Sequence, residues 1–200
     1  MAEIASALVK ALRDKTNVGM MDCKRALQET DGDMAKAEIL LRQKGIAGAA
    51  KKALRTAKEG IIASYIHMQG KVGVLIEVNC ETDFVAKNEN FRDFVKDITL
   101  HIAAAHPLYV SREEVPASLL ASEREVYAGQ VTDKPANIVE KIVEGKVNKF
   151  FGTVCLLEQA FIKNPDITIE VYIKSKMAEM GENILVRRFV RYAVGEELDS

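Results

Sequence analysis

The fold is decided at Val72-Gly73-Val74-Leu75-Ile76-Glu77-Val78-Asn79-Cys80 and, after Glu81, at Thr82-Asp83-Phe84-Val85-Ala86-Lys87-Asn88. The first run is short, apolar and rich in β-branched residues, which predicts a buried β-strand. Asn90 is a suitable N-cap for a helix that follows the second run. Large apolar residues then recur at helical spacing, at Phe91, Phe94, Val95, Ile98 and Ile102. The segment 82–88 therefore lies where a strand gives way to a helix.

Phe84 lies within this junction, off the regular apolar face of the predicted helix. An aromatic side chain in such a position either folds back on its own domain as a staple or stays exposed for a partner. The pattern alone favours the first alternative, because aromatic residues at the ends of elements usually pack against their own domain.

The remainder of the chain after residue 60 predicts an α+β core, an antiparallel sheet with helices on one side. Ser111 and Glu114 have the spacing of a capping box. The expected elements are a β-hairpin at 61–80, a helix at 90–105, an extended segment at 107–110, helices at 117–130 and 135–151, a turn at 164–166, a helix at 167–180 and a strand at 184–194.

The amino-terminal part has a different organisation. Residues 1–45 predict three short helices, the third ending at Gly45. Residues 46–59 are rich in alanine and lysine and poor in large apolar side chains, which indicates an exposed helical linker. We therefore divide the chain into a helical domain at 1–45, a linker at 46–59 and an α+β core at 60–200.

Composition excludes several classes of protein. The chain is 48% hydrophobic with a net charge of −1, so it lacks the sustained basic face of a nucleic-acid or membrane-surface binder. The start of the chain has no signal-peptide pattern and no apolar run is long enough to span a membrane, from which we expect a cytoplasmic protein. Cys23, Cys80 and Cys155 are far apart, which argues against a disulfide framework or a zinc site.

An enzymatic function is not favoured. The nearest candidates for a nucleophile, a base and an orienting group are Cys80, His67 and Asp83. Cys80 falls in an apolar strand, where a thiol behaves as a small hydrophobic group. His101 and His106 are better explained as structural or solvated residues than as metal ligands. The sequence has no glycine-rich phosphate loop, and we expect no metal and no cofactor.

Two segments carry a family resemblance. Glu77-Val78-Asn79-Cys80-Glu81-Thr82-Asp83-Phe84-Val85-Ala86-Lys87-Asn88 closely resembles the signature of elongation factor Ts, the family of nucleotide exchange factors of elongation factor Tu. Residues 12–27 resemble the second signature of this family, in the right order. Lys51-Lys52 and the segment 189–196 extend the resemblance over nearly the whole chain.

The resemblance implies a ubiquitin-associated-like bundle before the core and a chain that binds GDP-bound and nucleotide-free elongation factor Tu. It further implies that Asp83-Phe84, flanked by Thr82 and Val85, inserts as a wedge into the partner's nucleotide domain, disturbs the Mg²⁺ site and promotes GDP release. The implied additional contacts are Met20, Met21, Lys24, Lys52, Ala86, Lys87 and Asn88. The chain resembles the short form of the family, so we expect a homodimer.

Alternatives remain for these residues and for the function. Met20 and Met21 are equally compatible with the core of the helical bundle. Lys24 and Lys52 are equally explained as solvated charges. The alternative function is a non-catalytic adaptor, with a ubiquitin-associated-like bundle and a core that dimerises.

Overall fold

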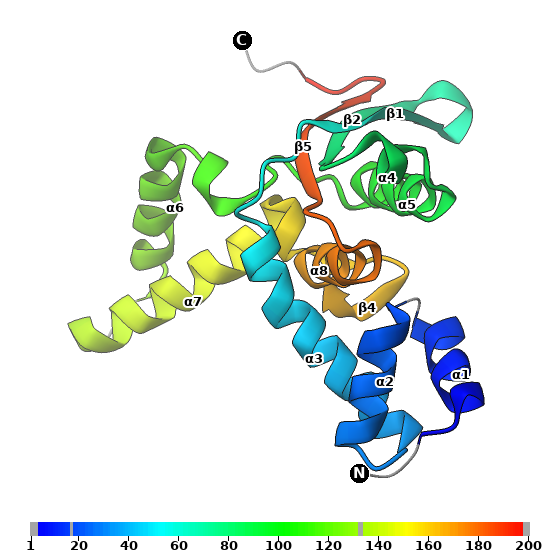
Figure 1. The fold of residues 1–200 in the computed structure, drawn as a ribbon. Coiled ribbons are helices and arrows are strands. Elements are labelled where there is room, and N and C mark those ends of the chain that lie inside the picture. The colour runs from blue at the N-terminus through cyan, green and yellow to red at the C-terminus, as the bar shows by residue number, and fades with distance from the viewer. Residues whose placement is uncertain (1–3, 17, 132–133, 198–200) are drawn as a thin grey trace. The chain divides into compact units, whose positions relative to one another are not determined.

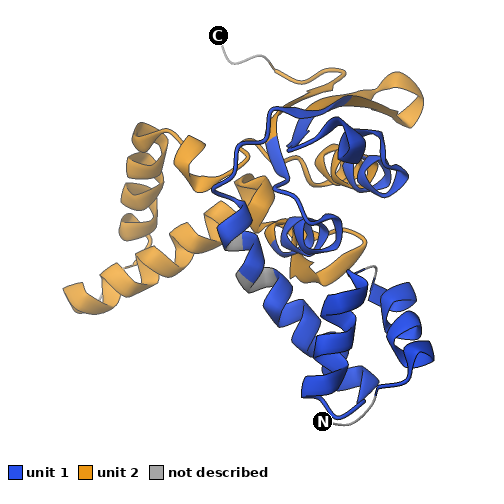
Figure 2. Cartoon of the chain, in the orientation of Figure 1, with its two compact units in different colours: residues 1–62, 77–95, 171–186 blue, residues 63–76, 96–170, 187–200 orange. Residues whose placement is uncertain are grey.

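The computed structural model describes residues 4–16, 18–131 and 134–197 (Figure 1). The chain forms two compact units (Figure 2). One unit comprises residues 1–62, 77–95 and 171–186, and the other comprises residues 63–76, 96–170 and 187–200. Several elements therefore begin in one unit and end in the other.

The amino-terminal helices are α1 (Ser6–Thr16), α2 (Met20–Glu29) and α3 (Met34–Lys52). Their buried side chains recur every three or four residues, so each helix turns one apolar face inward. Together they form a small core of Val9, Leu12, Cys23, Ala26, Leu27, Ala37 and Leu41. Asp33 caps α3, because its side chain accepts a hydrogen bond from the backbone N–H of Lys36. The three predicted helices are confirmed.

The predicted end of the third helix at Gly45 is wrong, since α3 continues to Lys52. Gly45 is not a helix terminator but a point of close packing. A Cβ atom at this position would lie 2.8 Å from the Cβ of Ala178. The division of the chain at residues 45 and 60 stays a prediction.

The central element is a three-stranded sheet with the order β1-β2-β5. β1 (Glu59–His67) and β2 (Val72–Cys80) form the predicted hairpin through the short 3-10 turn η1 (Met68–Gly70), and β5 (Leu185–Ala193) is the predicted final strand. The N–H of Val194, just after β5, donates to the carbonyl of Lys71, just before β2, at 2.9 Å. β5 therefore runs antiparallel to β2, and the α+β prediction is confirmed.

Helices α4 (Asp83–Lys87) and α5 (Glu89–Ala105) follow β2. The predicted apolar stripe of α5 is fully buried, at Phe91, Phe94, Val95, Ile98 and Ile102. The predicted cap at Asn90 is wrong, because the side-chain oxygen of Asn88 accepts from the N–H of Asn90 at 2.8 Å. Asn88 is also the C-cap of α4, so one residue ends the first helix and caps the second.

The predicted pair of helices after residue 115 is confirmed as α6 (Ala117–Gly129) and α7 (Ala136–Val154). Their shared core comprises Val115, Val143, Val147, Phe151, Val154 and Cys155. The predicted capping box is wrong: Ser111 makes no side-chain capping bond for η2 (Arg112–Glu114), and Glu114 accepts from the N–H of Val110 at 2.8 Å instead of from that of Ser111.

The predicted turn at Asn164-Pro165-Asp166 is wrong. These residues begin β4 (Asn164–Thr168), which pairs antiparallel with β3 (Ala160–Phe161), and the turn is at residues 162–163. The last helix, α8 (Ile169–Met180), starts later than predicted because residues 167–168 continue β4. A short 3-10 turn, η3 (Leu156–Glu158), precedes β3.

Cys23, Cys80 and Cys155 are free and buried. Within the described ranges, no group of three or more histidine, cysteine or carboxylate side chains could hold a metal ion. None of the helices in these ranges is long and apolar enough to cross a membrane.

Candidate functional site

The segment between β2 and α5 is a short helix whose start is fixed by Thr82. The hydroxyl oxygen of Thr82 accepts from the N–H of Val85 at 3.4 Å, which makes Thr82 the N-cap of α4. Lys87 pairs with Asp83 one turn earlier, at 2.6 Å. This hydrogen bond lowers the pKa of the Asp83 carboxyl and outweighs the opposite effect of desolvation. Ala86 is buried and anchors the inner side of the helix.

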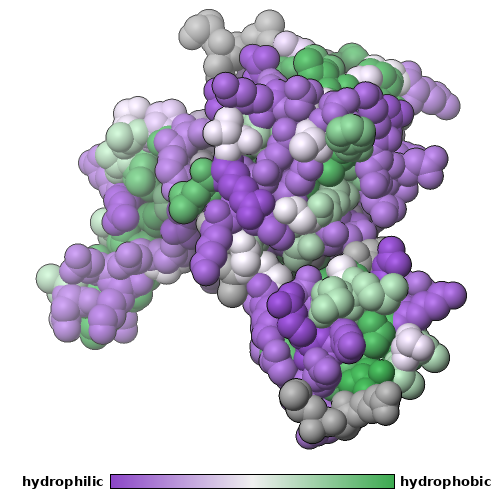
Figure 3. Space-filling view, viewed as in Figure 1, coloured by the Kyte–Doolittle hydropathy of each residue, from purple (hydrophilic) through white to green (hydrophobic). Residues whose placement is uncertain are grey.

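Phe84 lies on the outer side of α4, with 81% of its side chain exposed. The prediction from pattern alone, that it packs against its own domain, is therefore wrong. On this five-residue helix the inner side is taken by the buried Ala86, and Phe84 lies away from it. Apolar residues are exposed at several places on the surface (Figure 3), so exposure alone does not mark a binding residue. An exposed aromatic ring does offer a partner a large apolar contact area.

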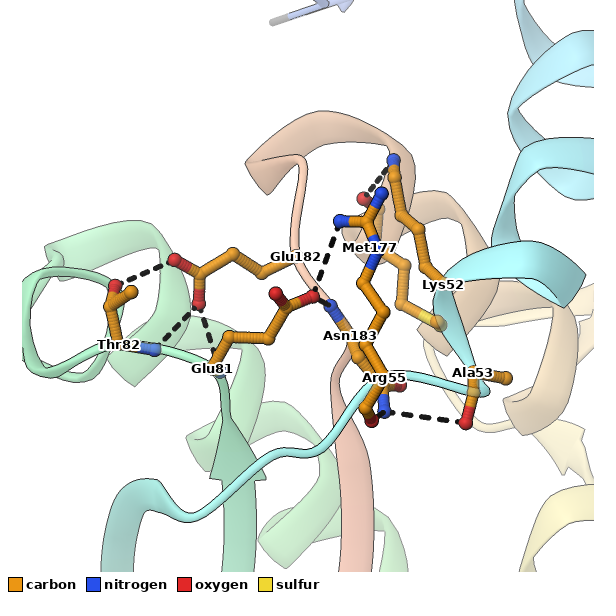
Figure 4. A network of polar contacts seen from close by, with 8 residues as sticks. All are labelled: Lys52, Ala53, Arg55, Glu81, Thr82, Met177, Glu182 and Asn183. Atoms are coloured by element: carbon orange, nitrogen blue, oxygen red, sulfur yellow. Dashed lines mark hydrogen bonds and ion pairs between the residues drawn. The ribbon is translucent and has the colours of Figure 1, made fainter.

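The start of α4 is fixed to the turn between α8 and β5 by Glu182 (Figure 4). One carboxylate oxygen of Glu182 accepts from the backbone N–H groups of Glu81 and Thr82, at 3.0 and 3.1 Å. The other oxygen accepts from the Thr82 hydroxyl at 2.6 Å. All three donors are thus satisfied by one side chain from a distant part of the chain.

Glu81 makes the reciprocal contact. Its carboxylate accepts from the N–H of Asn183 at 2.6 Å and pairs with Arg55 at 3.5 Å. The side-chain amide of Asn183 in turn donates to the carbonyl of Arg55 at 2.7 Å and to that of Ala53 at 3.5 Å (Figure 4). We call Arg55, Glu81, Thr82, Glu182 and Asn183 the Glu182 network.

Sequence reasoning did not identify Glu81, Glu182 or Asn183 as residues of the site. The bonded partners lie about a hundred residues apart in the chain. Glu81 lies in the signature segment but had no role assigned, and the sequence carried no signal for Glu182 or Asn183, because these contacts depend on the folded path of the chain rather than on a local motif.

Comparison with known proteins identifies the family. The family model described as elongation factor TS matches residues 47–196. The chain belongs to the elongation factor Ts family. A relative named elongation factor Ts from Geotalea daltonii is 57% identical over 198 residues, which cover 98% of this chain and 92% of the relative. Relatives of the same name from Carboxydothermus hydrogenoformans and Heliobacterium modesticaldum are 58% and 54% identical over 197 residues, covering 98% of this chain and 91% and 92% of theirs. As a member of the elongation factor Ts family, the chain is a translation elongation factor and not an enzyme.

The residues that the elongation factor Ts signature singles out on the helical bundle are largely exposed. Met20 and Met21 are 46% and 64% exposed, so the alternative that they form the bundle core is wrong. Lys24 is exposed on the same helix. Lys52 is less free, since its ammonium group donates to the carbonyl of Met177 at 2.9 Å. Burial, followed by repulsion from Arg55, lowers the pKa of Lys52.

The catalytic trio considered from sequence lacks a reactive nucleophile. Burial raises the pKa of the Cys80 thiol to about 11, and the thiol donates to the carbonyl of Thr82 at 3.2 Å. A neutral thiol in this position does not act as a nucleophile near pH 7. The Nδ1 atom of His67 is hydrogen-bonded to the Tyr65 hydroxyl at 2.9 Å. Of the two alternatives left for His101, structural or solvated, the structural one holds, since the ring is buried and bonded to Gln159.

Proposed function

We propose that this chain binds elongation factor Tu in its GDP-bound and nucleotide-free forms and promotes the release of GDP. Asp83 and Phe84 act as a wedge that enters the partner's nucleotide domain and disturbs its Mg²⁺ site. The observation that carries this proposal is the exposed Phe84 ring on a helix whose start is fixed by hydrogen bonds. Membership of the elongation factor Ts family supports it.

An exchange factor works by linkage rather than by bond chemistry. It binds the nucleotide-free partner more tightly than the nucleotide-bound partner, and the affinity of the partner for nucleotide must fall by the same factor. Burial of one phenylalanine contributes about 1.5–3 kcal/mol. A shift of ~10⁴ in the coupled equilibrium requires about 5.5 kcal/mol. Phe84 therefore needs support from a second surface.

The helical bundle supplies that surface through Met20, Met21, Lys24 and Lys52. The two methionines offer flexible apolar contact, which suits a binding surface. Lys24 acts mainly on the rate of association, as exposed charges at the rim of an interface do. Lys52, which is bonded to Met177, is held in a fixed orientation.

The remaining residues of the segment have different roles. Val85 flanks the wedge, and Asp83, Lys87 and Asn88 offer polar groups to the partner. Thr82 acts as a cap, because its hydroxyl already donates to Glu182 and accepts from Val85. Ala86 is buried within the chain and therefore contributes as an anchor of α4.

We further propose a homodimer formed through the sheet, in a cytoplasmic protein that contacts neither nucleic acid nor membrane. β1 and β5 are the edge strands. Ile66, Leu75 and Tyr192 are exposed large apolar residues of β1, β2 and β5. A Cβ on Gly73 would touch Ile66, and the Val194–Lys71 bond sets Tyr192 opposite Gly73, so these side chains share one face of the sheet. An apolar face of this kind suits a second copy of the chain.

The deciding experiment measures release of a fluorescent GDP analogue from purified elongation factor Tu at increasing concentrations of this chain. We expect the release rate to rise and then saturate. Binding without any acceleration would favour the adaptor function, and absence of both would overturn the assignment of the partner.

A further inference from the structure

We infer that Glu182 is a positioning residue, which sets the direction in which Phe84 points by holding the backbone at Glu81 and Thr82. This inference rests on the proposed exchange function. It concerns a residue outside both signature segments, on the turn that joins α8 to β5.

The first step of the argument is the dependence of α4 on outside contacts. A helix of five residues is too short to be stable by itself in water. Its conformation must therefore come from contacts with the rest of the chain, which are the burial of Ala86 and the groups that hold its two ends. The carboxyl end of α4 is held by Asn88, which also caps α5. The amino end of α4 is held by the hydrogen bonds of Glu182 to Glu81 and Thr82.

The second step concerns Phe84 itself. Its ring is 81% exposed, so side-chain packing within the chain contributes little to its orientation. The direction of the ring is set by the backbone of α4, and the backbone enters α4 through Glu81 and Thr82. The backbone N–H groups of Glu81 and Thr82 both donate to the same carboxylate oxygen of Glu182. If the Glu182 carboxylate moved, the backbone at Glu81 and Thr82 would no longer be held, and the start of α4 could change direction.

The third step is that Glu182 is itself held in place. The turn that carries it includes Gly181 at a φ of +79°, a conformation suited to glycine. The next residue, Asn183, donates its N–H to Glu81 at 2.6 Å. Glu81 and Glu182 thus each bind a backbone N–H of the opposite segment, and the two segments restrain each other.

Two substitutions separate position from charge. Glu182→Gln keeps the length of the side chain and an oxygen that can accept from both N–H groups, while its amide can donate to the Thr82 hydroxyl. Glu182→Asp keeps the charge but is one methylene too short to make the same bonds. A positioning role predicts that the Gln variant resembles the wild type and that the Asp variant does not. A role of the charge alone predicts the reverse.

The experiment measures GDP release from elongation factor Tu at saturating and sub-saturating concentrations of the wild type and of Glu182→Gln, Glu182→Asp and Glu182→Ala. For Glu182→Ala we expect the maximal rate to fall roughly tenfold, since a displacement of about 1 Å can cost up to ~10²-fold. The half-saturating concentration should change by less than about threefold, because the bundle surface is intact. Glu182→Gln should remain within about threefold of the wild-type rate.

Glu158→Ala is a control, because Glu158 is likewise a carboxylate that accepts hydrogen bonds from a distant segment, in its case from Arg112, but it makes none of the described contacts with residues 81–88. It should exchange at about the wild-type rate. Amide hydrogen exchange provides a second measurement: the N–H groups of Glu81 and Thr82 should exchange faster in Glu182→Ala, while those of α5 keep their protection.

The outcomes are distinguishable. If the wild type does not accelerate release, the proposed function fails. If the wild type and Glu182→Ala accelerate GDP release equally, the positioning role of Glu182 is overturned, while the proposed exchange function stands. If Glu182→Ala does not fold, the comparison of Glu182→Gln with Glu182→Asp still decides, and equal rates for these two would overturn the inference.

Discussion

Gly45 of α3 and Ala178 of α8 approach so closely that a Cβ on Gly45 would lie 2.8 Å from the Cβ of Ala178. The two backbones can pack at this distance only because residue 45 has no side chain. We expect Gly45→Ala to lower the free energy of unfolding by about 1–2 kcal/mol, since the cost of overpacking exceeds the gain of up to ~1 kcal/mol in helix propensity.

Gly48 provides a matched control for this prediction. It lies in the same helix, and a Cβ at this position would meet no atom within 4 Å. Gly48→Ala should therefore raise the free energy of unfolding by about 0.5–1 kcal/mol. Denaturant unfolding of both variants tests the pair. Equal and positive effects would show that the contact with Ala178 yields without cost.

The buried and hydrogen-bonded ring of His101 leads us to expect a lower free energy of unfolding at mildly acidic pH. Its Nδ1 accepts from the N–H of Ile162 at 3.3 Å and its Nε2 bonds the Gln159 oxygen at 2.9 Å, so the buried ring is held neutral. Burial lowers its pKa below the ordinary value of 6.5, against a smaller opposite effect of Gln159. Below that pH the unfolded chain binds a proton that the folded chain does not, and the free energy of unfolding falls.

The variant His101→Gln tests this origin, because an amide can donate and accept but does not titrate. Between pH 7.5 and pH 5.5 the free energy of unfolding of the wild type should fall further than that of the variant. Parallel curves would assign the pH dependence to other groups.

The elements with a strong local pattern could be predicted from the sequence. The α5 stripe and the β1–β2 hairpin follow from helical spacing and from a run of β-branched residues. The end of α3 could not be predicted, because Gly45 serves a contact with a helix that lies more than a hundred residues later. Asn164-Pro165-Asp166 has the composition of a turn, yet pairing with β3 holds it in a strand.

The candidate site shows the same limit. The junction at 82–88 could be located from the pattern, but not the exposure of Phe84, which depends on how the rest of the chain packs against α4. Thr82 was expected at the site, but the contacts of the Glu182 network could not be predicted. Its carboxylates look like ordinary surface charges until the fold brings the two segments together.

The thiols should be unreactive in the folded chain. Cys23, Cys80 and Cys155 are buried, and burial raises the pKa of Cys80 and of Cys155 to about 11. The thiolate is the reactive form, so alkylation at pH 8 should be slow. Mass spectrometry after treatment with iodoacetamide should show the native chain unmodified and the denatured chain modified at all three positions. Rapid modification of native Cys80 would contradict the described environment.

The proposed homodimer predicts a sedimenting mass of about twice the 22.1 kDa of the chain at micromolar concentration. Tyr192→Glu should shift this equilibrium toward the monomer, because a charge would be buried in the apolar face. Tyr192 is 67% exposed, so the substitution should not affect folding. Val126→Glu is the control. Val126 is also an exposed apolar residue but lies on α6, outside the sheet, so this substitution should leave the sedimenting mass unchanged. A wild-type chain that sediments as a monomer would exclude the dimer.

Phe84→Ala should separate function from stability. The exposed ring leaves no cavity when it is removed, so the free energy of unfolding should change by less than about 1 kcal/mol. GDP release from elongation factor Tu should nevertheless slow markedly, because the wedge is lost, while binding through the helical bundle persists. Asp83→Ala should act in the same direction and more weakly, because it removes one polar contact.

Phe91→Ala is the matched control, since Phe91 is fully buried only seven positions later in the chain. Truncation of a core phenylalanine costs about 3–5 kcal/mol. The two variants should therefore differ in what they change. Phe84→Ala should lower the release rate and leave the melting temperature nearly unchanged, whereas Phe91→Ala should lower the melting temperature strongly. A large drop in the melting temperature of Phe84→Ala would mean that the ring packs in the core in solution, and the wedge would then be lost as an explanation of exchange.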